Sequence, residues 1–155
     1  MYFKNKLREI YNDEEINLFV DMDGVITDYD FGSTLNFKDK RPIKTNIKTL
    51  SQLNKDSKIN LYILSICKTD AQIQDKNNWL DKQAPFFNIA NRYIISKEKY
   101  PDLSSKEIKL RIIRDIIESS KLSNVVLIDD DNGILKYIKE SNLNIILFQD
   151  SSLID

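Results

Sequence analysis

The sequence predicts an α/β protein, a three-layer, doubly wound sandwich around a parallel five-stranded sheet. Five short runs rich in Ile, Val, Leu and aromatic residues are continuously apolar, which is typical of strands buried on both faces. Segments with helical periodicity separate these runs. Strands that alternate with helices form parallel sheets with crossover helices. A length of 155 residues fits one such domain, and we assign residues 1–155 to it.

Each of the five runs has the length of a buried strand. The predicted strands are Asn17 to Val20, Ile59 to Ile66, Arg92 to Ser96, Asn124 to Ile128 and Leu143 to Phe148. An opening helix precedes the first strand and carries Phe3, Leu7 and Tyr11 on one face. We expect this helix to pack on the sheet or at a subunit contact.

Four further helices are predicted where apolar residues recur every three or four positions. Ser104 and Glu107 have the spacing of a capping box, which places the start of the third of these helices near Ser105. Pro85 ends the second helix. The apolar stripes are Ile43, Ile47 and Leu50; Ile73, Trp79 and Leu80 within 70–82; Ile108, Ile112 and Ile116; and Ile134, Leu135 and Ile138 after Asn132.

The composition excludes several classes of function. The chain has no histidine, which removes serine-histidine triads, cysteine-histidine dyads, histidine-ligated zinc and imidazole acid-base catalysis. Its single cysteine cannot form an internal disulfide. With 23 basic and 24 acidic side chains it is not a protein that coats nucleic acid by charge alone. No signal peptide and no run near the roughly 20 apolar residues of a membrane span is seen, so we expect a cytoplasmic protein.

Polar side chains gather where the predicted strands end, and an open parallel sheet binds its ligands at that edge. Carboxylates packed there would repel one another by several kcal/mol without a compensating charge. A hard cation, Mg²⁺ above all, suits a site with oxygen ligands only. Taken one by one, the same residues are also compatible with polar turns and helix caps. They are Asp21 and Asp23 after the first strand, Ser65 at the end of the second, and Asp129, Asp130 and Asp131 after the fourth.

These residues resemble the motifs of the haloacid dehalogenase-like (HAD) superfamily, whose fold is a Rossmann-like sandwich. The first strand and its continuation read FVDMDGVITD, like the first motif of that superfamily, and the second and fourth motifs resemble LYILS and VVLIDD. Lys106 corresponds to the lysine of the third motif. The resemblance extends from Asn17 to Phe148 with all four motifs in order.

The resemblance implies a Mg²⁺-dependent phosphomonoesterase. Asp21 would be the nucleophile that forms an aspartyl-phosphate, and Asp23 would be the acid-base residue. Asp129 would hold Mg²⁺ with the Asp21 carboxylate and the main-chain carbonyl of Asp23. Ser65 and Lys106 would hold the phosphoryl oxygens. An acid-base aspartate marks phosphohydrolases within this superfamily, which disfavours dehalogenase chemistry.

Some of these site assignments have alternatives within the sequence. Lys97 and Lys99 follow the third strand and compete with Lys106 for the phosphate. Asp130 is either an auxiliary metal ligand or a charge that favours the start of the next helix. Asp131 is expected to act in the turn and cap. Cys67 is expected to be an inert, partly buried thiol.

The spacing of the motifs leaves no room for a cap domain. A predicted helix and strand already fill the segment from Ser65 to Lys106, and the segment from Asp23 to the helix near Ile43 is short. An open site of this kind suits macromolecular ends, or small substrates when an oligomer supplies the lid, although nothing in the sequence indicates an oligomer.

The chain is similar to the 5′(3′)-deoxyribonucleotidases and to the phosphatase domain of phage polynucleotide kinase, which implies a nucleotide or a nucleic-acid phosphate end as substrate. The segment from Arg92 to Arg114 is rich in basic residues, and it forms either a contact for a phosphodiester strand or a solvated helix face. Two alternatives remain: a catalytically retired HAD-like module that binds or regulates, and a sugar-phosphate phosphatase capped by oligomerisation. The segment after Ser65, which reads ICK, departs from both similar groups and motivates the first alternative.

Overall fold

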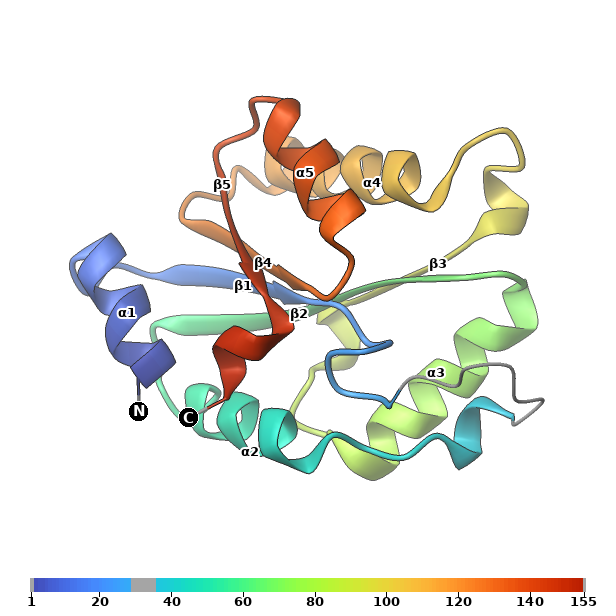
Figure 1. Ribbon diagram of the computed structural model, residues 1–155, viewed down its shortest axis with the longest axis horizontal. Helices are drawn as coiled ribbons and strands as arrows, with labels where there is room; N and C mark the ends of the chain where they lie inside the picture. Colours follow the sequence, from blue (N-terminus) through green and yellow to red (C-terminus); the bar gives the residue numbers. More distant parts are fainter. Residues whose placement is uncertain (1, 29–35, 155) are drawn as a thin grey trace.

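Five parallel strands form the centre of the protein in the computed structural model, which describes residues 2–28 and 36–154 (Figure 1). The strands lie in the order β3-β2-β1-β4-β5. This arrangement confirms the predicted doubly wound parallel sheet. Their bounds are β1 Ile16–Val20, β2 Ile59–Cys67, β3 Arg92–Ser96, β4 Val125–Asp129 and β5 Ile145–Gln149.

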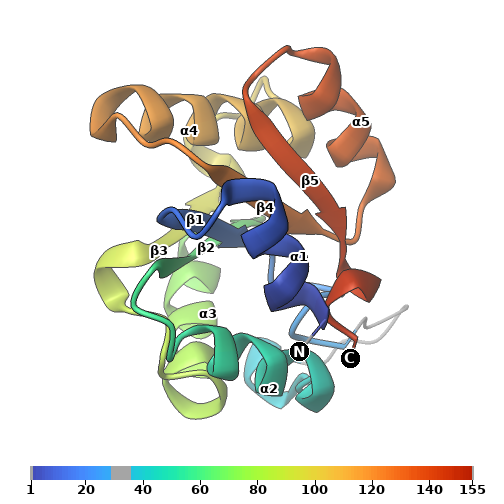
Figure 2. The same ribbon diagram turned by 90° about the vertical axis from the view of Figure 1, so that its left-hand side faces the viewer.

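Helices cover both faces of the sheet and make the three layers. Helices α4 and α5 lie over one face, and α2 and α3 lie over the other (Figures 1 and 2). None of the helices in the described part of the chain is long and apolar enough to cross a membrane. The bounds are α1 Tyr2–Tyr11, α2 Lys44–Leu53, α3 Asp70–Gln83, α4 Ser105–Ser120 and α5 Asn132–Glu140, with short 3₁₀ helices η1 Phe37–Asp39, η2 Ile89–Asn91, η3 Lys97–Lys99 and η4 Asp150–Leu153.

Local capping sets where the two longest helices begin. The Ser104 hydroxyl accepts from the Glu107 amide at 3.4 Å, and the Glu107 carboxylate accepts from the Ser104 amide at 2.8 Å. This is the predicted capping box, and α4 begins at Ser105 as expected. A second capping box, which we did not predict, starts α3 with Thr69 and Gln72.

Two of the strands begin later than predicted because a residue at or just before each expected start has a left-handed backbone conformation. Asn124 has φ 52°, a left-handed conformation that is incompatible with an extended strand, so β4 begins at Val125. Asn142 has φ 59° in the turn after α5, and β5 begins only at Ile145. Asparagine tolerates this conformation better than most residues.

Alternate residues of the central strands pack into the core on opposite faces of the sheet. Leu18 and Val20 of β1 pack in the cluster that includes α2 and α3, whereas Phe19 packs in the cluster that includes α4 and α5. The Phe19 ring also stacks on Tyr62 of β2, with ring centroids 4.5 Å apart. All five residues of β1 are buried, as continuous apolar strands predict.

The opening helix α1 packs on the sheet, which is the first of the two arrangements expected for it. Phe3 and Leu7 are fully buried in the same cluster as Leu18. The Phe3 ring meets Phe148 of β5 edge to face at 5.2 Å between centroids.

The topology places β1 beside β4 at the point where the sheet changes its winding direction. The chain leaves β1 through α2 on one face and leaves β4 through α5 on the other, so a crevice opens between the two strand ends. Val20 pairs with Ile128, and the Asp21 amide donates to the Ile128 carbonyl at 3.0 Å. Asp21 and Asp129 therefore leave the sheet side by side.

No cap domain lies among the described residues, as predicted. Between β1 and β2 these residues hold η1 and α2, and between β2 and β4 they hold α3, β3, α4 and two short 3₁₀ helices. The crevice at the strand ends is consequently reached without passing a second domain in the described part of the protein.

Asp56 ties α1 to the turn before β2. Its Oδ1 accepts from the Lys58 amide at 3.0 Å, and its Oδ2 lies 2.7 Å from Arg8 Nη2 and 3.2 Å from Lys4 Nζ. The backbone bond from Lys58 and the bond from Arg8 lower the pKa of Asp56 to about 2. A carboxyl whose pKa is lower in the folded protein than in the unfolded chain stabilises the fold only while it is ionised.

We therefore expect Asp56→Asn to lower the melting temperature at pH 7 and to have progressively less effect in acid. The difference from the wild type should begin to shrink below the unfolded pKa of about 4 and vanish as the pH falls through about 2. Thermal melting followed by circular dichroism between pH 7 and pH 2 measures this. Asp115→Asn, an exposed carboxylate on α4, is the control. An effect of Asp56→Asn that is independent of pH would contradict the assignment.

Candidate active site

Three carboxylates meet at the ends of β1 and β4. Asp21 follows β1, Asp129 ends β4, and Asp130 comes next, and their oxygens lie within 4.8 Å of one another. Asp21 is 7% exposed and Asp129 is fully buried. Burial raises the pKa of Asp21 to about 6, with the charges of Asp129 and Asp23 adding to the effect and Lys109 opposing it. The structure thus brings together three of the carboxylates singled out in the sequence.

Lys109 of α4 is the cation that bridges two of these carboxylates. Its Nζ lies 3.0 Å from Asp21 Oδ1 and 2.5 Å from Asp129 Oδ2, and the side chain is 3% exposed. Burial works to lower the pKa of this lysine, but the two aspartates outweigh it and raise the pKa above the ordinary value. One ammonium group faces the two buried carboxylates, so Asp21 and Asp129 together keep an excess of negative charge that a metal cation would neutralise.

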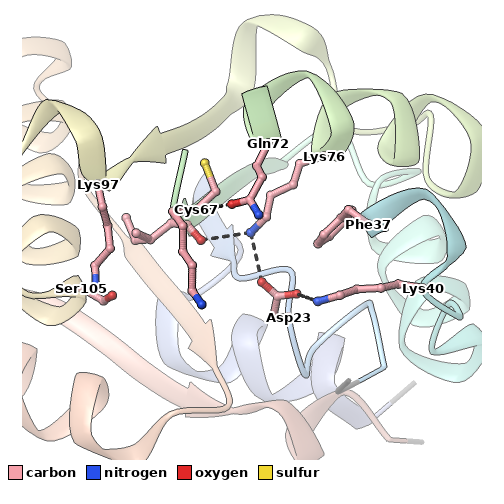
Figure 3. Close-up of a pocket in the computed structure, with 10 residues that line it drawn as sticks. Asp23, Phe37, Lys40, Cys67, Gln72, Lys76, Lys97 and Ser105 are labelled. Atoms are coloured by element: carbon pink, nitrogen blue, oxygen red, sulfur yellow. Dashed lines mark hydrogen bonds and ion pairs between the residues drawn. The ribbon is translucent and has the colours of Figure 1, made fainter. Parts of the chain in front are cut away.

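Asp23 turns away from this group toward two other lysines (Figure 3). Its Oδ1 lies 2.7 Å from Lys40 Nζ, and its Oδ2 lies 3.0 Å from Lys76 Nζ. Burial would raise the pKa of Asp23, but Lys76 and Lys40 outweigh it and hold the pKa below the ordinary value. The carboxylate of Asp23 is therefore not part of the acidic group formed by the described residues, and metal ligation through its main-chain carbonyl stays a prediction.

Ser65 is buried at the end of β2, and its Oγ lies 2.7 Å from Lys76 Nζ. Lys76 also donates to the Ile66 carbonyl at 3.0 Å, so one ammonium group joins β2 to Asp23. Lys76 was not among the site residues predicted from the sequence. A signal was present, because Lys76, Trp79 and Leu80 have the spacing of one helix face, and a lysine on a buried face must have a polar partner.

The structure places Lys109, and not Lys106, against the carboxylates, which corrects the position expected for the third-motif lysine. Lys106 is exposed, and its Nζ lies 5.1 Å from the centroid of the Tyr137 ring in α5. It stands in the first turn of α4, three residues before Lys109, and its ammonium group lies against α5 and not against the carboxylates. Lys109 shares a helix face with buried Ile113 and Ile116. This spacing is the sequence pattern that could have identified Lys109 as a buried lysine.

The remaining candidates divide between the site and the surface. Lys97 lines a cavity beside the site, whereas Lys99 is exposed. Asp131 caps α5, because its Oδ1 accepts from the Gly133 amide at 2.8 Å, as expected of a turn and cap residue. Cys67 is buried, and burial raises the pKa of its thiol, which keeps it in the unreactive protonated form.

Two adjoining cavities of opposite charge lie at this edge of the sheet. The smaller, of about 160 Å³, is lined by Asp21, Asp129, Asp130 and Asp131 with Lys109. The larger, of about 420 Å³, is lined by four lysines, and among the described residues one carboxylate, that of Asp23, lies in its wall. Asp23, Ile66 and Ser105 line both cavities, which makes them continuous. The arrangement can hold a cation beside an anion.

Comparison with known proteins finds a likeness in fold. No model of a known protein family matches the chain, and no curated protein matches its sequence. A solved structure, the N-terminal part of the protein BF1531 from Bacteroides fragilis containing a phosphatase domain complexed with Mg, matches with a TM-score of 0.59 at 14% sequence identity. The match covers 92% of this chain and 38% of the other, so this chain has the fold of only part of that protein.

Lys109 should be essential to the stability of the metal-free protein. Replacing it by methionine, which has a similar volume, leaves two buried carboxylates without their cation, and we expect a loss of roughly 3 to 5 kcal/mol in the free energy of unfolding. Urea denaturation at pH 7.5 with a chelator present measures this. Lys106→Met, in the first turn of the same helix, is the control and should change the free energy of unfolding by no more than about 1 kcal/mol. Equal effects of the two substitutions would contradict the geometry.

Proposed function

We propose that this protein is a member of the HAD-like superfamily and a Mg²⁺-dependent phosphomonoesterase. The observation that carries the proposal is the acidic cavity directly beside the basic one, with Asp21 and Asp23 at the first strand end. A phosphate ester bound to a metal ion needs both kinds of surface at once, a cation-binding group and donors for its own oxygens. The likeness in fold to a phosphatase domain supports the same conclusion.

The acidic group fits a magnesium ion by the chemistry of its donors. Asp21, Asp129 and Asp130 offer only oxygen ligands, and Lys109 alone does not neutralise the buried pair Asp21 and Asp129. These three carboxylates would hold the ion. When bound, the ion would supply positive charge to the phosphoryl oxygens and lower their repulsion toward the attacking carboxylate.

Asp21 and Asp23 carry the proposed chemistry. An Asp21 oxygen attacks phosphorus in line, the new oxygen–phosphorus bond forms, and the bond to the alcohol oxygen breaks. Because Lys40 and Lys76 hold Asp23 ionised, Asp23 first takes up a proton from solvent. It gives this proton to the leaving oxygen, then accepts one from the water that attacks the aspartyl-phosphate and returns it to solvent. Inorganic phosphate and the alcohol leave, and both aspartates return to their starting states.

The donors for the phosphoryl oxygens come from two elements, α4 and β2. Lys109 replaces Lys106 in the proposed role, since it already lies against Asp21. The Ser65 hydroxyl, held by Lys76, faces the same edge, and Ser105, which lines both cavities, is the first residue of α4. Helix N-termini favour bound phosphate.

The proposed substrate remains a nucleotide or a nucleic-acid phosphate end. The described residues include no cap over the cavities, and the larger cavity has the volume for part of a leaving group. A retired module that only binds would not need Asp23 in its present place.

Asp21→Asn should abolish phosphate release from p-nitrophenyl phosphate in the presence of Mg²⁺. Removing the nucleophile of a covalent route is expected to cost roughly a thousandfold or more in kcat. The assay follows nitrophenolate absorbance, with excess chelator as a second condition that should also abolish turnover. Asp75→Asn, an exposed aspartate on α3, is the matched control. Full activity in Asp21→Asn, or in chelator, would overturn the proposal, and an inactive wild type would favour the retired module.

Mg²⁺ should raise the melting temperature of the wild type and not that of Asp129→Asn. A ligand that binds only the folded state at one hundred times its Kd stabilises it by about 2.7 kcal/mol. Asp129→Asn removes one ligand and keeps the shape of the side chain. Differential scanning fluorimetry across a Mg²⁺ titration reads binding without any need for turnover. The same shift in both proteins would place the ion elsewhere.

A further inference from the structure

The larger cavity has more positive charge than the reacting phosphate requires. Its wall carries Lys40 after η1, Lys68 after β2, Lys76 of α3 and Lys97 of η3, and the described residues add one carboxylate to it, that of Asp23. Lys40 and Lys76 are paired with that carboxylate. Within the described part of the chain, no ion pair engages Lys68 or Lys97. In Figure 3, Lys97 lies across the cavity from Lys40.

Lys68 and Lys97, which take part in no ion pair with another described residue, are neighbours by strand register. Cys67 of β2 pairs with Ser96 of β3, and Lys68 and Lys97 are the residues directly after this pair. Parallel strands lie about 4.8 Å apart, so the two lysines leave the sheet from adjacent positions. Both side chains line the cavity, and from these positions the two ammonium groups can reach a common anion, which offsets the repulsion between them.

The backbone around these lysines is held in place. The Gln72 side chain accepts from the Lys68 amide at 2.8 Å, and the Glu98 carboxylate accepts from the Asp70 amide at 3.1 Å. The Glu98 amide in turn donates to the Ser96 hydroxyl at 3.1 Å. The segment after β2 and the turn after β3 are thus joined, which reduces the ordering cost of binding a ligand between them.

Among the described residues of the wall the aromatic side chain is Phe37, and it does not offer a platform for a nucleobase. The ammonium groups of Lys40 and Lys76 lie 4.7 Å and 5.2 Å from the centroid of the Phe37 ring. A ring engaged by two cations stabilises positive charge in the cavity. The wall therefore favours an anionic group over a stacked base.

We propose that this basic cavity binds a second phosphate group of the substrate, carried by the leaving group and held by Lys68 and Lys97. The inference rests on the proposed phosphomonoesterase function and specifies its substrate class. The substrate is then a compound with two phosphates a few bonds apart, one cleaved at Asp21 and the other retained. A dianionic phosphate matches two ammonium groups in charge, and the retained phosphate undergoes no bond change.

The test compares 1,3-propanediol bisphosphate with 1,3-propanediol monophosphate. The two phosphates of the first compound are equivalent, so a preference of twofold is statistical. We expect a ratio of kcat/KM of roughly tenfold or more for the bisphosphate, and this ratio should fall as sodium chloride is raised because salt screens the lysines. Initial rates of phosphate release give the ratio for the first turnover.

Lys68→Ala with Lys97→Ala should bring the ratio near the statistical value by lowering kcat/KM for the bisphosphate. Lys55→Ala, an exposed lysine in the turn before β2 at the opposite edge of the sheet, is the matched control and should keep the full ratio. Melting curves verify that both variants fold. Because the wild-type ratio and its salt dependence need no variant, they test the inference even if the double variant is unstable.

Turnover of p-nitrophenyl phosphate, which has no second anion, separates this inference from the function on which it rests. If the wild type hydrolyses that ester but shows a ratio near two, or if the double variant keeps the wild-type ratio, the second-phosphate site is wrong and the phosphomonoesterase stands. If the wild type hydrolyses none of the three esters, the phosphomonoesterase is wrong and the inference falls with it.

Discussion

The burial of Asp21 beside Asp129 is the constraint on which the active edge of this protein depends. Parallel register brings the two residues out of β1 and β4 at neighbouring positions, and the core beneath them excludes water. Two carboxylates in such a place are stable only with positive charge close by. Lys109 supplies part of that charge from α4, which explains why a lysine occupies the otherwise apolar inward face of that helix.

The separation of charge at the site follows from which strand supplies which residue. The ends of β1 and β4 carry aspartates, and the ends of β2 and β3 carry lysines, so the electrostatic potential changes sign across the sheet. Asp23 lies at the boundary and lines both cavities. A phosphate ester placed there would have its metal-binding oxygens on one side and its alcohol on the other.

The sequence predicted the sheet, the helix starts and the carboxylates, because these depend on local periodicity, capping and the position of strand ends. Ser104 and Glu107 act through bonds three residues apart, and Asp21 needs only the end of an apolar run. Lys109 and Lys76 could not be found in the same way. Their roles arise from partners on other elements, such as Asp129 and Ser65, which only the packing of α4 and α3 on the sheet brings near.

The contact between Phe3 and Phe148 joins the first helix to the last strand. Tyr11 adds a bond from the end of α1 to the Val125 carbonyl at 3.5 Å, so both contacts span most of the chain. Pairings of such long sequence separation slow folding, because the loop must close before the contact forms. The apolar face of α1 therefore completes its packing only after β5 has joined the sheet.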